Sequence, residues 1–592
     1  MATIELSGER IEDVARTDLP RACELARELV AANPYDEDAA KLLRDVVERL
    51  AQSAPPRPDP DADLPAPLIE AATLLSAAED EAAEIIVRQY AAEYPNDARA
   101  MAMMAEIAAR CEFFDDAQRI LTRALQVDPD CVDALLGMAK LVNHLSFAQI
   151  SEDRGEEALT ILRRALEIDP TNIHVVSLYS SILVRFRRVK DAIPWYDRLL
   201  KLDPTHWLAW SNYAILLNGL GEFGQSIAAL RTTVAFNPKY GLAWWEIANL
   251  KVSKLFDSDI ERMEELLSDP TVDPESRGQI HFALAKAFDQ AKRFEDAAEQ
   301  LKLGNAIKRE LEPYDTAKVT SDVANSEKIF TPAFFKQREG LGDPRPDPIF
   351  IIGMQRAGTT LVEQILSSHS QVEGTEELFY ILQLGTEISQ RNPNVSWQLG
   401  LARASERELA DLGGAYLKWA RHHRLSERPL FIDKNPANWR FAGLIATILP
   451  NAKIIDVRRN PMDCCFANYT QHYNNGVGYS YSLADAGLYY SDYVRLMRHF
   501  ADIAPGRIHK LLYDDLVDDL EANVRRLLDY VGLPFEESCL RFYDTDRPVL
   551  TPSSQQVRQP INRKGFGRWR SYEPWLGDLQ DALGDTLDQW RQ

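Results

Sequence analysis

Residues 347–378, DPIFIIGMQRAGTTLVEQILSSHSQVEGTEEL, carry the pattern that decides the fold of the second half of this chain. A short apolar run, residues 349–352, enters a loop bounded by Gly353 and Gly358, and an apolar-periodic segment leaves it. This order is typical of a strand, a phosphate-binding loop and a helix. N–H groups at a helix start lack intrahelical partners and carry the positive end of the helix dipole, so the pattern predicts an anion site.

The residues inside the loop argue against a nucleoside-triphosphate site. Such a site needs a lysine before Ser/Thr, because the ammonium contacts the β and γ phosphates while the hydroxyl ligates magnesium. Here the spacing from Gly353 to Gly358 is kept, but Thr359 and Thr360 follow it and Arg356 supplies the cation. We therefore predict a terminal phosphate that is held rather than transferred. A nucleotide kinase or NTPase is the rival interpretation.

Length and charge bound the remaining possibilities. A chain of 592 residues is long enough for several domains. Its net charge of −23 disfavours nucleic acid or an anionic membrane as partner, because such surfaces are bound largely by Lys and Arg. An acidic protein that binds an anionic nucleotide must concentrate its cations locally, and the stretches GMQRAG, VRRNP and NRKGFGRWR do so.

The cysteines and the N-terminal segment indicate a reducing, aqueous compartment. The six cysteines have neither metal-ligand spacing nor a disulfide pattern, so we expect reduced thiols and no metal. The first 18 residues lack the apolar core of a signal peptide, and no run of 18 apolar residues occurs in the sequence. We therefore expect a cytoplasmic protein without a membrane partner.

The first half of the sequence is a repeat array. A proline recurs, several times at the 34-residue tetratricopeptide period, and a small residue precedes it by twelve positions, as two closely packed helices require. The longer interval between Pro129 and Pro170 predicts a loop insertion near SFAQISEDRG, and residues 279–307 predict one more unit. The prolines are Pro34, Pro95, Pro129, Pro170, Pro204 and Pro238, and the small residues are Ala22, Ala83, Ala117, Ala158, Ala192 and Ser226.

Aromatic residues recur in the same array. Trp195, Trp207, Trp210, Trp244 and Trp245 have the spacing of residues that fill the seam between paired helices. The alternative is a concave face that docks a peptide or protein partner, since a solenoid offers an extended curved surface.

The predicted fold class is an all-α tetratricopeptide superhelix followed by an α/β domain with a parallel sheet. In the second half, the strand-like runs IFIIG, PLFIDK, AKIIDVRR and IHKLLYDD alternate with helical segments, and ligands of such sheets bind at the carboxyl ends of the strands. We expect an N-terminal helical unit over 1–54, a proline-rich linker over 55–67, repeats over 68–324 and the α/β domain over 325–592.

The ordered motifs of the α/β half resemble a known family. GMQRAGTT followed by EGTEEL is similar to the 5′-phosphosulfate loop and acidic motif of sulfotransferases that use 3′-phosphoadenosine 5′-phosphosulfate (PAPS), in particular the tyrosylprotein-sulfotransferase-like branch and its bacterial relatives with tetratricopeptide repeats. The resemblance covers roughly residues 344–572. It implies PAPS as co-substrate, bound by Arg356, Ala357, Gly358, Thr359, Thr360, Arg459, Tyr513, Arg563, Lys564 and Gly565.

The same resemblance implies the catalytic residues. Glu377 takes the place of the general base, with neighbouring Glu376 as second choice, while Lys434 and Ser553 take the places that stabilise the leaving phosphate. From the residues alone, either glutamate could equally well favour the dipole of the following helix, and Tyr513 could simply pack. His369 is a weaker candidate base, because an imidazole there also suits the end of a helix; His472 and the pair His422/His423 are weaker still.

Two motif positions depart from the family. Eight residues after Arg459, the expected serine of the 3′-phosphate motif is Ala467, although Asn468 beside it could donate a hydrogen bond. Arg568 stands beside Trp569 where the tyrosylprotein branch has lysine. Arg568 retains the charge, so Ala467 is the one motif residue that supports a second rival, a non-catalytic adaptor with a decayed transferase domain. The sulfate acceptor, whether a peptide, a protein or a small hydroxyl compound, is left open by the sequence.

Overall fold

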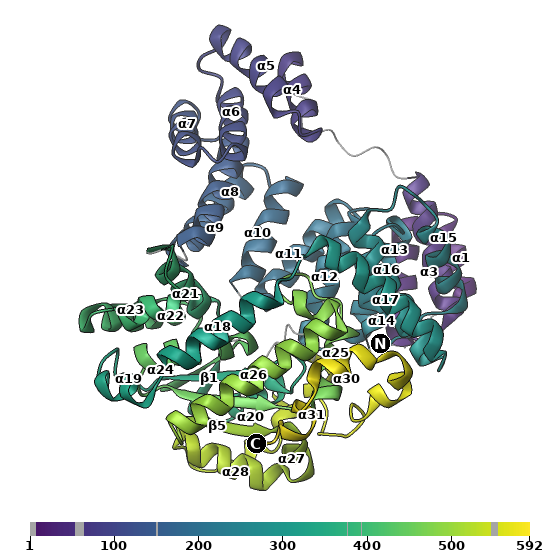
Figure 1. Ribbon diagram of the computed structural model, residues 1–592. Coiled ribbons are helices and arrows are strands. Elements are labelled where there is room, and N and C mark those ends of the chain that lie inside the picture. Colours follow the sequence, from purple (N-terminus) through teal and green to yellow (C-terminus); the bar gives the residue numbers. More distant parts are fainter. Residues whose placement is uncertain are drawn as a thin grey trace. The chain divides into compact units, whose positions relative to one another are not determined.

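The computed structural model describes residues 7–53, 64–149, 152–186, 188–250, 252–375, 377–391, 393–545 and 554–592 (Figure 1). The chain divides into two compact units: Met1–Leu29 with Lys41–Leu216, and Val30–Ala40 with Leu217–Gln592. The last repeats therefore belong to the same unit as the α/β half.

The described part of the first half is helical and follows the proline period. Helices end two residues before Pro95, Pro129, Pro170, Pro204 and Pro238. The helices are α1 Gly8–Ala15, α2 Leu19–Ala32, α3 Glu37–Ser53, α4 Ala66–Ser76, α5 Asp80–Glu93, α6 Ala98–Arg110, α7 Phe114–Val127, α8 Val132–Gln149, α9 Glu152–Ile168, α10 Ile173–Arg185, α11 Val189–Leu202, α12 Trp207–Leu220, α13 Phe223–Phe236, α14 Gly241–Asn249, α15 Asp257–Leu267, α16 Pro274–Gln290 and α17 Phe294–Leu311.

The small residues of the repeats lie where the helices meet. All six predicted positions, from Ala22 to Ser226, are at most 1% exposed. Trp210, Trp244 and Trp245 are buried as well, which confirms the packing interpretation for these three. Trp210 and Trp244, 34 residues apart, each donate an indole N–H to the carbonyl of the proline six residues earlier, at 2.9 and 2.8 Å. These two repeats thus share a hydrogen bond as well as a helix pair.

Two features of the repeats concern the predicted extra unit and the predicted insertion. The extra unit expected over residues 279–307 is present as the pair α16 and α17. The loop insertion expected near residue 150 is wrong: the surplus residues lengthen α8 and α9 to 18 and 17 residues, against 14 for α7 and α11. A longer helix keeps its backbone hydrogen-bonded, so the repeat can absorb extra residues without a long loop.

The second half contains a five-stranded parallel sheet with the order β2-β3-β1-β4-β5. Its strands are β1 Pro348–Gly353, β2 Val372–Gly374, β3 Leu430–Lys434, β4 Lys453–Arg458 and β5 Ile508–Leu512. The predicted fold class is confirmed. Each of the four strand-like runs singled out in the sequence forms one of these strands, and the short β2 was not foreseen.

The other described elements of the second half are helical. They comprise α18 Thr316–Ile329, α19 Pro332–Gln337, α20 Thr359–Ser367, α21 Tyr380–Arg391, α22 Trp397–Ala402, α23 Glu406–Arg421, η1 Pro436–Phe441, α24 Ala442–Ile448, α25 Pro461–Tyr469, η2 Gly478–Tyr481, α26 Leu483–Ile503, α27 Tyr513–Asp518, α28 Leu520–Val531, η3 Glu537–Cys539, η4 Phe542–Asp544, α29 Ser554–Val557, η5 Arg568–Trp575, α30 Gly577–Leu583 and α31 Thr586–Gln589.

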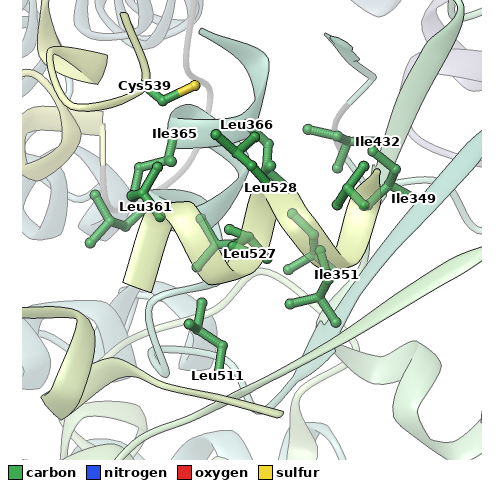
Figure 2. Close-up of a cluster of buried hydrophobic side chains, with 14 of the residues drawn as sticks. Ile349, Ile351, Leu361, Ile365, Leu366, Ile432, Leu511, Leu527, Leu528 and Cys539 are labelled. Carbon is green, nitrogen blue, oxygen red and sulfur yellow. The ribbon is translucent and has the colours of Figure 1, made fainter. Parts of the chain in front are cut away.

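One face of the sheet packs on α20 and α28. Figure 2 shows Ile349 and Ile351 of β1 among leucines and isoleucines of these helices, all of them buried. Alternate residues of β1 point to the opposite face, where Phe350 contacts the ring of Tyr416 at 5.3 Å. Because both faces are covered, every residue of β1 is apolar or glycine, as expected for a central parallel strand.

The expected domain start at residue 325 falls inside α18. Upstream of that position, Thr316 and Thr320 donate to Asp485 and Asp492 of α26 at 2.6 Å each. We therefore propose that the α/β domain begins with α18. Across the described residues, no helix is long and apolar enough to span a lipid bilayer.

Candidate active site

The carboxyl ends of four neighbouring strands bring the predicted site residues together. The sheet register pairs Ile351 of β1 with Lys434 at the end of β3, and Gly353 of β1 with Val457 of β4. Arg459 follows β4 directly, and Tyr513 follows β5. Lys434, the loop after Gly353, Arg459 and Tyr513 therefore lie side by side along one edge, where ligands of parallel sheets bind.

The phosphate loop has a backbone that explains its glycines. Gly353 and Gly358 have φ of 147° and 103°, and Arg356 itself has φ of 65°. A Cβ on Gly358 would lie 2.3 Å from Cδ2 of Tyr513, so the ring of Tyr513 packs directly on the loop. Ala357 and Thr359 are buried, whereas Arg356 and Thr360 are half-buried. The loop leads into α20, whose first N–H groups are the predicted anion donors.

Arg459 connects the phosphate loop to the C-terminal motif. Its Nη1 donates to the carbonyl of Arg356 at 3.2 Å, and its Nη2 donates to the carbonyl of Gly565 at 2.6 Å. The guanidinium carbon lies 5.3 Å from the centroid of the Tyr513 ring and 5.8 Å from that of Phe566. Within the described residues its buried Nε has no hydrogen-bond partner. A buried donor of this kind fits a site built for an anion.

The C-terminal motif lies over this edge but is more exposed. Arg563, Lys564 and Gly565 are all exposed, and Arg563 forms an ion pair with Asp518. Phe566 stacks on Tyr513 with 5.7 Å between centroids, and the N–H of Gly567 donates to Asp463 of α25 at 2.8 Å. Gly565 and Phe566 thus reach the edge, while the side chains of Arg563 and Lys564 remain on the surface.

The predicted base and the predicted leaving-group cation are in contact. Glu377 lies between β2 and α21 with 42% of its side chain exposed, and its Oε1 is 2.5 Å from Nζ of Lys434, which is 1% exposed. The exposed carboxylate of Glu377 can contact an incoming acceptor, whereas Lys434 is buried at the carboxyl end of β3. Glu376 and Ser553 fall outside the described residues.

A buried carboxyl next to Lys434 was missed by the sequence argument. Asp433 is fully buried on β3 and accepts a hydrogen bond from the Tyr416 hydroxyl at 2.8 Å. Its other oxygen accepts the N–H of Leu378 at 3.4 Å. Burial raises the pKa of Asp433 to about 8. The available signal was an acidic residue inside the apolar run PLFIDK. Through its bond to the N–H of Leu378, Asp433 also contacts the segment that carries Glu377.

The candidate histidines have structural partners. His369 is buried at the end of α20, where Nε2 faces the carbonyl of Pro534 at 3.0 Å and Nδ1 accepts the N–H of Gln371 at 3.1 Å. His423 contacts the hydroxyl of Tyr380, and His472 contacts Glu275. These contacts favour the structural interpretation for the three histidines.

Asn468 does not replace the missing serine hydroxyl in the way the sequence suggested. Its amide nitrogen donates to the carbonyl of Gln355 at 2.7 Å and to that of Cys464 at 2.9 Å, while its oxygen accepts from the Tyr473 hydroxyl at 2.8 Å. Both amide hydrogens are therefore committed, and Asn468 supports the phosphate loop from the side. Gln355 and Tyr473 were not singled out in the sequence, since a fold-dependent contact leaves no motif.

The described residues contain no group of three or more His, Cys, Asp or Glu side chains placed to hold a metal ion.

Comparisons with known proteins agree with this organisation. Residues 348–537 match the model of the sulfotransferase family, and residues 114–182 and 180–241 match tetratricopeptide repeat models. An uncharacterized protein of Aquifex aeolicus (strain VF5) is 33% identical over 373 residues, covering 62% of this chain. This chain spans about half, 48%, of the length of that relative.

Two further matches concern the α/β half. A putative protein-tyrosine sulfotransferase of Caenorhabditis briggsae is 23% identical over 236 residues, covering 37% of this chain and 80% of that protein. The sulfotransferase domain of the Synechococcus PCC 7002 olefin synthase is 21% identical, with a TM-score of 0.29, covering 40% of this chain and 90% of that domain. By the family models, the chain carries tetratricopeptide repeat matches followed by a match to the sulfotransferase family.

Proposed function

We propose that this protein transfers a sulfuryl group from PAPS to an acceptor hydroxyl. The observation that carries the proposal is the alignment of Lys434, the phosphate loop, Arg459 and Tyr513 along the ends of four adjacent strands. Loop amides, Arg356 and the threonines would hold the 5′-phosphosulfate, and Arg459 with the segment from Arg563 to Gly565 would hold the 3′-phosphate. Tyr513 would pack beside the nucleotide.

PAPS supplies the sulfuryl group, and the chain's own residues supply position and charge. As the acceptor oxygen bonds to sulfur, the bond from sulfur to the bridging oxygen breaks and leaves its electron pair on the phosphate. Glu377 would accept the acceptor's proton, and Lys434 would stabilise the negative charge on that bridging oxygen, with Ser553 as its expected helper. The exposed Glu377 and the buried Lys434 fit these two tasks.

The acceptor and the role of the repeats are part of the proposal. A peptide or protein hydroxyl is the favoured acceptor, because tetratricopeptide surfaces suit extended chains. A small hydroxyl compound is the other candidate, and acceptor screens should contain both kinds.

The deciding experiment is a thermal-shift titration with adenosine 3′,5′-bisphosphate, the product left by PAPS. Binding to the native state alone raises the melting temperature, so wild type should show a saturable shift that Arg356→Ala loses. Alanine retains a Cβ, so the backbone strain at φ of 65° is unchanged. Arg345→Ala is the matched control, because Arg345 is half exposed and paired with Asp343 away from the loop.

The outcomes separate the rival functions. Absence of a shift in wild type would exclude a working PAPS site and favour the adaptor. A shift with ATP and magnesium but none with the bisphosphate would favour a kinase or NTPase. With binding established, transfer of ³⁵S from labelled PAPS to a peptide and phenol panel should occur in wild type and fall by about 100- to 10,000-fold in Glu377→Gln, the range for a lost general base.

A further inference from the structure

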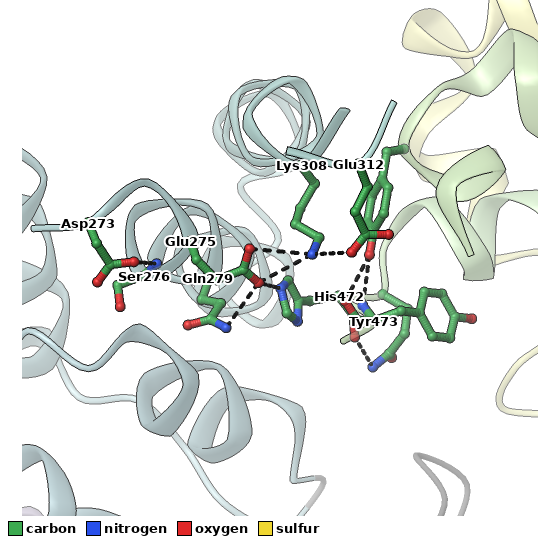
Figure 3. A network of polar contacts seen from close by, with 10 residues as sticks. Asp273, Glu275, Ser276, Gln279, Lys308, Glu312, His472 and Tyr473 are labelled. Carbon is green, nitrogen blue, oxygen red and sulfur yellow. Dashed lines mark hydrogen bonds and ion pairs between the residues drawn. The ribbon is translucent and has the colours of Figure 1, made fainter. Parts of the chain in front are cut away.

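The last repeat supplies contacts to the donor site at both ends of one helix. Helix α16 runs from Pro274 to Gln290 in the same compact unit as the sheet. Near its start, Glu275 contacts His472 and Lys308 (Figure 3). Near its end, Asp289 contacts two residues of the C-terminal motif region. Neither carboxylate belongs to any motif of the sulfotransferase domain.

Asp289 contacts Arg568 and Tyr572, which follow Gly565 and Phe566 at the donor edge. Its Oδ2 accepts from Nη2 of Arg568 at 2.6 Å, and its Oδ1 accepts from the hydroxyl of Tyr572 at 2.7 Å. Tyr572 is 3% exposed, and its ring lies 5.4 Å from Phe294 of α17 and 4.7 Å from Phe466 of α25. The ring is thus wedged between the last repeat and the helix that follows Arg459.

From this anchor the chain reaches the donor edge within three residues. Gly567, next to Arg568, donates to Asp463 of α25, and Gly565 accepts from Arg459, which also contacts the carbonyl of Arg356. A shift at Arg568 would therefore move the carbonyl that orients Arg459.

The segment over the donor edge is also fixed on its other side by a repeat helix. Nη2 of Arg558 donates to the carbonyl of Gly219, near the end of α12, at 2.9 Å. Ten residues separate Arg558 from Arg568, and both ends of this stretch are therefore held by repeats. A loop with both ends fixed loses less conformational entropy when it closes on a ligand.

The start of α16 supports the phosphate loop through a chain of contacts. His472 contacts Glu275 at 2.9 Å, and the next residue, Tyr473, donates to Asn468, which in turn donates to Gln355 of the phosphate loop (Figure 3 shows Glu275, His472 and Tyr473). Asn305 of α17 adds a bond to the carbonyl of Tyr469 at 3.1 Å.

We propose that Asp289 of the last tetratricopeptide repeat is a positioning residue of the donor site. Asp289 holds the segment 558–568 in place, so that Arg459 and Gly565 recognise the 3′-phosphate of the nucleotide. This inference rests on the proposed function. It makes the last repeat a part of the nucleotide site, so that a change in the repeats reaches donor affinity.

The test compares two nucleotides by isothermal titration calorimetry of the full chain. Adenosine 3′,5′-bisphosphate carries both phosphates, and adenosine 5′-monophosphate lacks the 3′-phosphate that the segment would recognise. Asp289→Ala should weaken the bisphosphate about tenfold and leave the monophosphate within about twofold. General loosening of the fold would weaken both alike, so the ratio of the two dissociation constants separates positioning from structural damage.

Two further variants keep the test decisive. Tyr572→Phe retains the ring between Phe294 and Phe466 and loses the bond to Asp289, so the same ratio should change in the same direction by about threefold. Asp296→Ala is the control, because Asp296 is a half-exposed carboxylate of α17 paired with Arg293. Bisphosphate binding that is unchanged or tighter in Asp289→Ala would overturn the inference alone, whereas a wild type that binds no bisphosphate would overturn the proposed function.

Discussion

The phosphate loop and the C-terminal segment meet at Arg459, yet different forces hold them. The phosphate loop joins a central strand to a buried helix, and its shape follows from three left-handed or extended backbone positions and the apolar core beneath it. The C-terminal segment has exposed side chains, and the hydrogen bonds that it donates to the repeats hold it at both ends. A loop held by its main chain leaves a motif in the sequence. The contacts that hold the C-terminal segment lie outside its own motif, on residues far away in the sequence.

The largest effect should come from a methyl group in the phosphate loop. Gly358→Ala forces a residue with a Cβ to φ of 103° and places that carbon 2.3 Å from Tyr513. We expect a loss of unfolding free energy on the order of 3 kcal/mol, from strain and overpacking together, and loss of bisphosphate binding. Urea denaturation and calorimetry measure the two effects.

Gly532→Ala is the matched control for this comparison. Gly532 ends α28 with φ of 91°, and an added Cβ would have nothing within 4 Å. Its cost should be the backbone term of about 1–2 kcal/mol, with nucleotide binding retained. Equal costs at the two glycines would mean that Tyr513 yields and that main-chain geometry alone sets the loop.

Removal of the side chain that joins the two regions should come next. Arg459→Ala deletes charge-assisted hydrogen bonds to the carbonyls of Arg356 and Gly565. A hydrogen bond to a charged group is worth about 1.5–3 kcal/mol, so the loss of one such bond to the nucleotide phosphate should lower bisphosphate affinity by roughly 10- to 150-fold. Arg428→Ala is the control, because the Arg428 guanidinium donates to backbone carbonyls of residues 367–372, which lead into β2. Unchanged affinity in Arg459→Ala would show that the two regions act independently.

The sheet side also carries a buried carboxyl, which predicts a pH effect. The native pKa of Asp433, about 8, exceeds its usual value, so the native state binds more protons between about pH 4 and 8. Its contribution to stability therefore falls as pH rises through that window. The unfolding free energy of wild type minus that of Asp433→Asn should fall by on the order of 1 kcal/mol per pH unit between pH 5.5 and 7.5.

Denaturation in urea at several pH values measures this slope. Asp411→Asn serves as the control, because the Asp411 side chain is 72% exposed. Parallel pH profiles for wild type and Asp433→Asn would refute the prediction and imply that Asp433 is ionised in the native protein.

The smallest effect should come from the indirect support of the phosphate loop. Tyr473→Phe removes the hydroxyl that donates to Asn468 at 2.8 Å and keeps the ring. The unfolding free energy should fall by about 1 kcal/mol, the net value of one hydrogen bond, with bisphosphate affinity within about threefold of wild type. Tyr35→Phe, at a tyrosine that is 57% exposed, should change neither. A tenfold loss of affinity in Tyr473→Phe would show that polar support governs this loop as well.

The sequence predicted the fold and the strand edge because both depend on local patterns. Apolar runs predicted four of the five strands, the proline period predicted the helix ends, and the glycine loop predicted the turn between β1 and α20. The short β2, the buried Asp433 and the commitment of Asn468 to Gln355 were not predicted. Each depends on which segments lie side by side in the folded domain. The spacing of residues within one segment does not predict such contacts between segments.

The contacts of α16 have a consequence for the order of events during synthesis. Asp289 lies 279 residues before Arg568, and Gly219 lies 339 residues before Arg558. At roughly 5–20 residues per second, a ribosome would need about a quarter of a minute to a minute to supply Arg568 after Asp289. During that interval the last repeats lack these C-terminal contact partners. The candidate donor site is therefore complete only after the C-terminal segment has been synthesised.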